Sequence, residues 1–390
     1  MFDFGTLTML LVLASVAVAD IMLAAVYEPG HNKLVLNPAY PVPTPGEGEV
    51  LLKVAACGVC HSDVSSDPAQ LGAGVQNIST TQLYGVLIID PSNPNSGTST
   101  IGTGLDGGYA EFVLVNQSQL FPVPDGLAPE VATAGTDSLL TVFNAVNNVA
   151  QVTTGERVLI YGVGGLGHQA VQLAKHLGAT VFAVDLRPEA RQLALDLGAT
   201  QVFDLEDFAA VTSNGTFHVD TVVDFVATAQ SFELSKAAVA LSLSEGFAGL
   251  STPGKIVLVG ISADNLNFAS VDLIESNIRV YTSLYGSRND MQSAFDLLSQ
   301  GVIKPNITVA PLEDINTALE ALTAHDVTGR MVVIPGLNST ATTPRNYLAW
   351  WFIRLDGLLY VECRSRKRPF SQESHAQLTG AIGSTLPSLP

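Results

Sequence analysis

The chain has 390 residues, of which 47% are hydrophobic and 14% are charged. This length and composition predict a folded protein with room for two domains and exclude a disordered chain. Acidic residues number 36 against 18 basic ones, and the formal charge of −18 disfavours binding to nucleic acid or to an anionic membrane. We therefore expect a small-molecule partner. The three cysteines, Cys57, Cys60 and Cys363, indicate no disulfide framework and favour a reducing compartment, the cytoplasm.

The first residues allow two interpretations. Residues 7–19 are apolar and end in an Ala-x-Ala pattern, as in a signal peptide, but Asp3 stands where a basic segment is expected. Alternatively the natural start is Met22, because the residues after it predict a strand and a turn. We favour Met22. A membrane span is not expected, because Asp20 interrupts the apolar run.

The first part of the chain is predicted to be rich in β-strands. Apolar alternation between turn-forming residues predicts strands at 49–60, 107–115 and 120–124. We assign residues 22–138 to this first domain, after an apolar N-terminal extension at residues 1–21.

Strands then alternate with helices, which predicts a parallel sheet covered on both faces. The strands are expected at 157–162, 180–186, 219–227 and 255–261, and the helices at 167–179 and 187–199. This second domain is assigned to residues 139–286. The β-rich domain resumes at 287–336 with two helices, at 289–301 and 312–326, and a last strand at 329–335. Residues 337–390 are predicted to be an extension outside the fold.

A glycine motif indicates where the second domain binds its ligand. Gly162, Gly164 and Gly167 have the G-x-G-x-x-G spacing, with Gly165 inside it, directly after a predicted strand and before a predicted helix. Such glycines allow a tight turn and a close backbone approach, and the helix N-terminus offers free N–H groups to a pyrophosphate. The alternative is a glycine turn that only lets a helix and a strand pack closely.

An acidic residue at the end of the next strand indicates which dinucleotide is bound. Asp185 is placed to accept hydrogen bonds from the adenosine ribose and to repel a 2′-phosphate, which favours NAD over NADP. Arg187 lies close enough to leave NADP open. A surface or helix-capping role for Asp185 is the other interpretation, and His168 and His176 on the following helix are interpreted as packing or surface residues.

With "GVCHSD" at 58–63, "GVGGLG" at 162–167 and "GRMVV" at 329–333, the sequence resembles the medium-chain zinc-dependent alcohol dehydrogenases from about Met22 to Pro335. The resemblance implies an α/β fold, in which a Rossmann domain with a doubly wound parallel sheet is inserted into a GroES-like β-rich catalytic domain. It also implies NAD-dependent hydride transfer between an alcohol or carbonyl and the nicotinamide, and a homo-oligomer.

The resemblance also implies roles for single residues. Cys60 matches a ligand of the catalytic zinc, and Asp137 stands where many relatives have a second cysteine ligand. Ser62 matches the hydroxyl that takes the alcohol proton. His61 matches a residue that passes this proton on or contacts a cofactor phosphate. Asp63 matches the acid that orients the histidine ligand of the metal.

Further positions match contacts to the cofactor. Thr141 matches a nicotinamide contact, the backbone of Val259 to Ile261 matches the segment that holds the carboxamide, and Arg330 matches a basic residue near the phosphates. Two alternatives remain open: Asp137 could cap the helix that follows it, and Arg330 could be a surface residue. Cys57 is interpreted as a buried bystander.

One segment of the family is missing. Relatives follow the Cys-His-Ser-Asp run with a Gly-His-Glu motif and usually with a four-cysteine zinc loop, but residues 64–110 contain no His, Glu or Cys. The resemblance therefore implies an incomplete catalytic zinc site and no structural zinc. Three hypotheses follow: an impaired zinc-dependent dehydrogenase, a zinc-free quinone or enoyl reductase, and an NAD-binding protein without activity, including a mispredicted or truncated gene product.

Overall fold

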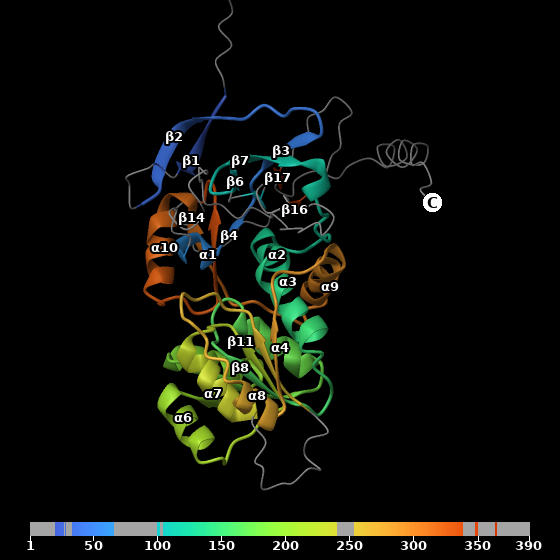
Figure 1. The fold of residues 1–390 in the computed structure, drawn as a ribbon. Coiled ribbons are helices and arrows are strands. Elements are labelled where there is room, and N and C mark those ends of the chain that lie inside the picture. The colour runs from blue at the N-terminus through green and yellow to red at the C-terminus, as the bar shows by residue number, and fades with distance from the viewer. Residues whose placement is uncertain are drawn as a thin grey trace, which may run out of the picture.

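The computed structural model describes residues 20–26, 28, 33–65, 100–101, 104–239, 253–337, 348–349 and 363–364. Within this part of the chain, a β-rich body lies above a body built on a parallel sheet (Figure 1). The interpretations of residues 1–19 and of most of 337–390 lie outside the described residues. No described helix is long and apolar enough to cross a membrane.

A six-stranded parallel sheet forms the core of the second body. Its strand order is β10-β9-β8-β11-β12-β13. The bounds are Arg157–Tyr161 for β8, Thr180–Val184 for β9, Gln201–Phe203 for β10, Thr221–Asp224 for β11, Gly254–Leu258 for β12 and Ile278–Thr282 for β13. The strand order reverses between β8 and β11, and in such sheets the crevice at the carboxyl ends of those strands is the ligand site.

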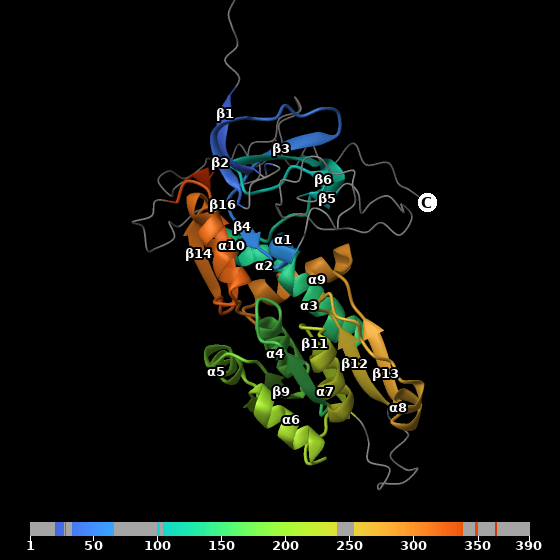
Figure 2. The same ribbon diagram turned by 60° about the vertical axis from the view of Figure 1, so that its left-hand side comes forward.

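Helices cover both faces of this sheet, as the sequence predicted. Successive side chains of a strand point to opposite faces, and on β8 Val158 and Ile160 join one apolar cluster while Leu159 and Tyr161 join another. The helices of this body are α4 (Gly167–His176), α5 (Pro188–Leu197), α6 (Leu205–Ser213), α7 (Ala229–Val239) and α8 (Ser270–Glu275). Figure 2 shows the sheet with α4 and α7 beside it.

The β-rich body consists of small sheets. Antiparallel pairs join β1 (Ile21–Val26) to β2 (Val35–Pro41) and β3 (Glu49–Lys53) to β7 (Phe112–Asn116), while β15 (Arg330–Ile334) lies between β14 (Ile307–Pro311) and β4 (Cys57–Val59). Two short pairs are β5 (Thr100–Ile101) with β6 (Gly104–Leu105) and β16 (Leu348–Ala349) with β17 (Cys363–Arg364).

Two strand predictions need correction. Residues 49–60 were expected to form one strand, but β3 and β4 are separate and belong to different sheets, because their partners β7 and β15 come from distant parts of the chain. Residues 120–124 form no strand. Pro122 and Pro124 lack the N–H that a sheet requires, which explains the failure.

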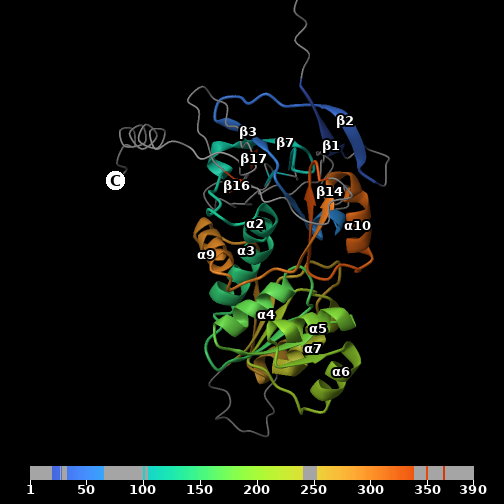
Figure 3. The same cartoon turned by 180° about the vertical axis from the view of Figure 1, so that it is seen from behind.

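A helical layer connects the two bodies. It contains α2 (Pro129–Thr136), α3 (Ser138–Phe143), the π-helical segment Asn144–Val149 and α9 (Arg288–Ser299). The last of these belongs to residues 287–336, which are called the returning chain below. Figures 1 and 3 both show α9 beside α2 and α3. The remaining helices are α1 (Ser62–Ser65), α10 (Ile315–Thr323) and the 3-10 turns Gln117–Gln119 and Leu312–Asp314. A Cβ at Gly135 on α2 would lie only 2.8 Å from the ring of Phe295 on α9. The two helices therefore pack in close contact.

The turn between β8 and α4, residues 162–167, is called the glycine turn below. A Cβ at Gly167 would lie 1.8 Å from the carbonyl oxygen of Gly162, so only glycine lets α4 begin there. A Cβ at Gly164 would meet nothing within 4 Å. The same turn therefore contains one glycine required for packing and one that borders open space.

We predict that Gly167→Ala lowers the free energy of unfolding by about 1–3 kcal/mol or more, because the new methyl group overlaps the Gly162 carbonyl. The better helix propensity of alanine, about 1 kcal/mol, offsets only part of this loss. Gly164→Ala is the matched control and should change the free energy by less than about 0.5 kcal/mol. Urea unfolding of both variants measures the difference, and equal midpoints would contradict the close approach.

Candidate active site

The glycine turn lies at the carboxyl end of β8, at the switch point of the sheet. Gly162 has φ 89°, a left-handed conformation that favours glycine, and its N–H donates to the carbonyl of Val184 on β9 at 2.8 Å. A Cβ on Gly162 would lie 2.7 Å from Cγ2 of Val226, in the loop after β11. Two loops from neighbouring strands thus meet at this point, and the space beside Gly164 stays open.

Asp185 borders the same space. One carboxylate oxygen accepts the N–H of Val163 at 2.8 Å, and the other accepts the backbone N–H and Nε of Arg187 at 2.9 and 3.2 Å. The guanidinium of Arg187 also donates to the carbonyls of His325 and Val327 at 3.0 and 2.5 Å. Arg187 is therefore held by Asp185 and by the returning chain.

Asp224, which the sequence did not single out, organises the loop after β11. Its buried carboxylate accepts the N–H groups of Val226 and Ala227 at 2.8 and 2.9 Å and the hydroxyl of Ser231 at 2.6 Å. Its carbonyl accepts the N–H groups of Val259 and Gly260 at 2.9 and 3.1 Å.

Asp224 thus ties together the loops that end β11 and β12. The backbone of Val259 to Ile261, predicted to hold the carboxamide, lies in the second of these loops. The Ile261 side chain is 82% exposed.

His168 is buried and makes a hydrogen bond at each ring nitrogen. Nδ1 lies 2.8 Å from the carbonyl of Gly164, and Nε2 accepts the N–H of Asn306 at 3.1 Å. This pairing requires a neutral ring with its proton on Nδ1, and burial lowers the pKa of His168 to about 4. His168 therefore connects the glycine turn to the returning chain. The exposed His176 fits the predicted surface role.

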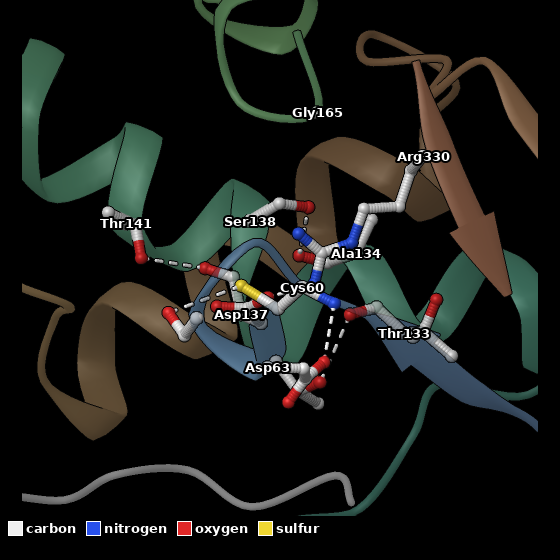
Figure 4. Close-up of polar contacts among 12 residues, drawn as sticks. Cys60, Asp63, Thr133, Ala134, Asp137, Ser138, Thr141, Gly165 and Arg330 are labelled. Carbon is white, nitrogen blue, oxygen red and sulfur yellow. Dashed lines mark hydrogen bonds and ion pairs between the residues drawn. The ribbon is translucent and has the colours of Figure 1, made fainter. Parts of the chain in front are cut away.

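Cys60 and Asp63 lie together at the end of β4 (Figure 4). The Asp63 carboxylate accepts the N–H of Cys60 at 2.8 Å and the hydroxyl of Tyr109 at 2.7 Å, and the buried Cys60 thiol donates to the Ser62 hydroxyl at 3.6 Å. Burial raises the pKa of Cys60 to about 11 and that of Asp63 from 3.8 to about 6. Cys57 is also buried, as interpreted from the sequence.

Asp137 lies at the break between α2 and α3 with φ −136° and ψ −78°. Its side chain makes no capping hydrogen bond, so the helix-cap alternative is wrong. Instead the carboxylate pairs with Nη2 of Arg330, and Figure 4 shows the two side chains pointing toward each other. The hydroxyl of Thr141, the predicted nicotinamide contact, donates to the Asp137 carbonyl at 2.8 Å.

Arg330 is the first residue of β15 and is only 3% exposed, so the surface alternative is also wrong. It lies beside the glycine turn, since a Cβ at Gly165 would be 3.5 Å from its Cδ. Burial is the largest single effect and opposes its charge, but Asp137, Cys60 and Asp63 together outweigh burial and raise the pKa of Arg330. Cys60, Asp63, Asp137 and Arg330 are called the polar cluster below.

Three ring side chains, those of His61, His325 and Tyr285, lie near the polar cluster. The exposed His61 stacks on His325, with ring centroids 5.6 Å apart and planes 6° apart. Burial and then His325 lower the pKa of His61. The pKa of Tyr285 is raised by burial and then by Asp137 and Cys60, which indicates that its ring lies near them. The sequence offered no signal for Tyr285 or His325.

Comparisons with known proteins agree with this geometry. The family described as zinc-binding dehydrogenase matches residues 165–300. An alcohol dehydrogenase of Geobacillus stearothermophilus is 30% identical over 321 residues, covering 73% of this chain and 92% of that protein. One of Rhizobium meliloti is 29% identical over 353 residues, covering 80% and 98%.

Two solved structures show the same overall fold. Acetophenone reductase from Geotrichum candidum in complex with NAD superposes with a TM-score of 0.64 at 28% identity, covering 80% of this chain and 97% of that one. A cobalt- and zinc-bound alcohol dehydrogenase from Pyrobaculum aerophilum superposes with a TM-score of 0.63 at 25% identity, covering 80% and 99%.

The strand order, the switch point and the glycine turn are those of a dinucleotide-binding Rossmann domain. The sequence relatives specify which: the chain belongs to the family of medium-chain zinc-type alcohol dehydrogenases and is an NAD-dependent oxidoreductase of the alcohol dehydrogenase type. The resemblance found in the sequence, with its α/β fold, is thereby confirmed.

The polar cluster does not fit the catalytic zinc of the family. A catalytic zinc needs three protein ligands. Among the residues that the structure describes, no group of three or more His, Cys, Asp or Glu side chains could hold a metal ion. Of the two predicted ligands, Cys60 bonds to Ser62 and Asp137 is paired with Arg330. Asp63, predicted to orient a histidine ligand, bonds to Cys60 and Tyr109 instead.

We predict that Asp63 makes the protein less stable as the pH rises from about 4 to about 6. The raised pKa means that the folded state binds this proton more tightly than the unfolded chain, so stability is lost when the proton leaves. The loss is about 3 kcal/mol, at about 1.4 kcal/mol for each pKa unit.

Urea unfolding at pH 4.5 and 7 tests this expectation. Asp63→Asn should flatten the pH dependence of the unfolding free energy, whereas the exposed control Asp125→Asn should keep the slope of the unmodified protein. An unchanged slope in Asp63→Asn would refute the assignment.

Proposed function

We propose that the chain binds NAD(H) in the crevice between the ends of β8 and β11 and transfers hydride between the nicotinamide and a small alcohol or carbonyl compound. The observation that carries the proposal is the glycine turn, with its left-handed Gly162 and the open space beside Gly164, bordered by Asp185. A pyrophosphate in that space would meet the N-terminus of α4, a ten-residue helix whose first N–H groups favour an anion.

The surroundings of Asp185 support NAD over NADP. A carboxylate accepts hydrogen bonds from both ribose hydroxyls and repels a 2′-phosphate. Arg187 is the cation that could bind such a phosphate, but its guanidinium is bonded to Asp185 and to two carbonyls of the returning chain. Binding a 2′-phosphate would require breaking these bonds.

Ser62 and His61 are proposed to handle the proton. In alcohol oxidation a hydride passes from the carbinol carbon to the nicotinamide, and the hydroxyl proton leaves through Ser62 and the exposed His61 to solvent. In the reverse direction the same groups return a proton to the carbonyl oxygen. Ser62 lies beside Cys60 at the end of β4, and His61 reaches the surface, which supports this route.

The loss of metal activation should slow alcohol oxidation and carbonyl reduction alike. Alcohol oxidation requires a group that makes the hydroxyl proton acidic, and the catalytic zinc that supplies this in the family does not fit the polar cluster. Carbonyl reduction passes through the same transition state, so it lacks the same polarisation by a metal. The similarity to an acetophenone reductase supports ketones as a substrate class to test.

Replacing Asp185 tests the cofactor site. Asp185→Ala should weaken NADH binding at least tenfold, because hydrogen bonds to a charged acceptor are worth about 1.5–3 kcal/mol each. NADPH binding should change less. The matched control is Asp196→Ala, an exposed acid on α5, which should leave both affinities unchanged. Fluorescence titration measures the affinities, and equal NADH binding by both variants would count against the site.

A second candidate function is NAD(H) binding without turnover. The observation that favours it is the pairing of Asp137 with Arg330 where the family places a metal ligand. NADH consumption with a panel of ketones, aldehydes, quinones and enones separates the candidates. Carbonyl reduction that is lost in Ser62→Ala, with NADH binding retained, supports the first proposal. NADH binding with no turnover supports the second, and selective reduction of quinones or enones supports the zinc-free reductase.

A further inference from the structure

We propose that the guanidinium of Arg330 takes the place of the catalytic metal in this chain, so that the polar cluster contains the Asp137–Arg330 ion pair and binds no metal. In this arrangement a cation fixed to the chain compensates Asp137, which the family would use as a metal ligand. The proposal does not depend on cofactor binding, and its tests use no cofactor.

The donor set is the first argument. A zinc ion that keeps an open position for substrate needs three protein ligands. The polar cluster offers only the Cys60 thiol and the Asp137 carboxylate oxygen that is not paired with Arg330. Residues 64–110, where relatives supply a His and a Glu, contain neither residue type and no Cys. Within the described chain, Asp63 is committed to Cys60 and Tyr109.

The space around Arg330 is the second argument. Two glycines lie against the side chain at contact distance: a Cβ at Gly58 on β4 would lie 3.4 Å from Nη2, and a Cβ at Gly165 would lie 3.8 Å from Nη1. The guanidinium thus fills the region between β4, the glycine turn and Asp137. A metal ion bound to the same carboxylate would have to displace it.

Electrostatics is the third argument. Two cations a few ångströms apart in a buried site repel strongly, and here they would share one carboxylate. Arg330 is 3% exposed and its side chain leaves Nε without a hydrogen-bond partner in the described structure. Its charge is therefore compensated chiefly by Asp137. Moving Asp137 onto a metal would leave Arg330 buried and unpaired, which is strongly unfavourable.

Zinc binding provides the direct test. The purified full chain is incubated with zinc, dialysed and analysed for metal, in parallel with Cys60→Ser. We expect less than 0.1 zinc per chain in both proteins. A ligand that binds the folded state raises the melting temperature. Since we expect no zinc to bind, added zinc should leave the melting temperature of the unmodified protein unchanged. About one zinc per chain that is lost in Cys60→Ser would overturn the proposal.

A double-mutant cycle tests the ion pair itself. Arg330→Met and Asp137→Asn should each raise the equilibrium constant for unfolding roughly a hundredfold or more, because each leaves one partner buried alone. The double variant should unfold less readily than either single variant. If the effects simply add, the pair is not the compensating interaction. Should a single variant fail to fold while the double variant folds, the same coupling is demonstrated.

Discussion

The burial of the Arg330 charge is the constraint on which the arrangement of the site depends. A guanidinium that is 3% exposed is tolerated only with an opposite charge beside it, and Asp137 provides that charge from 193 positions earlier in the chain. The helical layer breaks at Asp137, whose carboxylate pairs with Arg330. Gly58 and Gly165 lie against the Arg330 side chain. One ion pair thereby joins β4, the helical layer, β15 and the glycine turn.

Uncharged hydrogen bonds add to this junction. Gln169 on α4 donates to the carbonyl of Gly165 at 2.8 Å and to the hydroxyl of Ser138 at 2.7 Å. Gln172, one turn later, exchanges two hydrogen bonds with the backbone of Lys304 in the returning chain. With His168 bonded to Asn306, three side chains of α4 connect this helix to the helical layer and to the returning chain. These bonds hold α4, which begins at the glycine turn, in a fixed position.

The site has two parts: a dinucleotide half around the glycine turn and a substrate half around Cys60. The dinucleotide half has a left-handed Gly162, a close approach at Gly167 and an acid at the end of β9. The substrate half retains Cys60, Ser62 and Asp63, but these residues bond mainly to one another and to Tyr109. The chain thus combines the glycine turn of a dinucleotide-binding fold with a substrate half whose polar groups are bonded to one another.

Sequence patterns predicted the elements that local interactions fix. The alternation of strands and helices identified the parallel sheet, and α4, α5 and α9 begin within one residue of the predicted positions. Strands β3 and β4 were merged, because an apolar run does not show that two partners, β7 and β15, divide it between two sheets. The proline-containing residues 120–124 show a similar limit, since apolar character alone does not supply ladder N–H groups.

By itself the sequence determined the family, the glycine turn and the positions of Cys60, Asp137 and Arg330, because motif spacing and residue chemistry are written along the chain. Only the tertiary structure decided what these residues do to one another. Asp137 was assigned to a metal and Arg330 to a phosphate, yet folding brings them into one ion pair. His168, Asp224 and Tyr285 joined the site for the same reason, since burial and long-range contact exist only once the chain has folded.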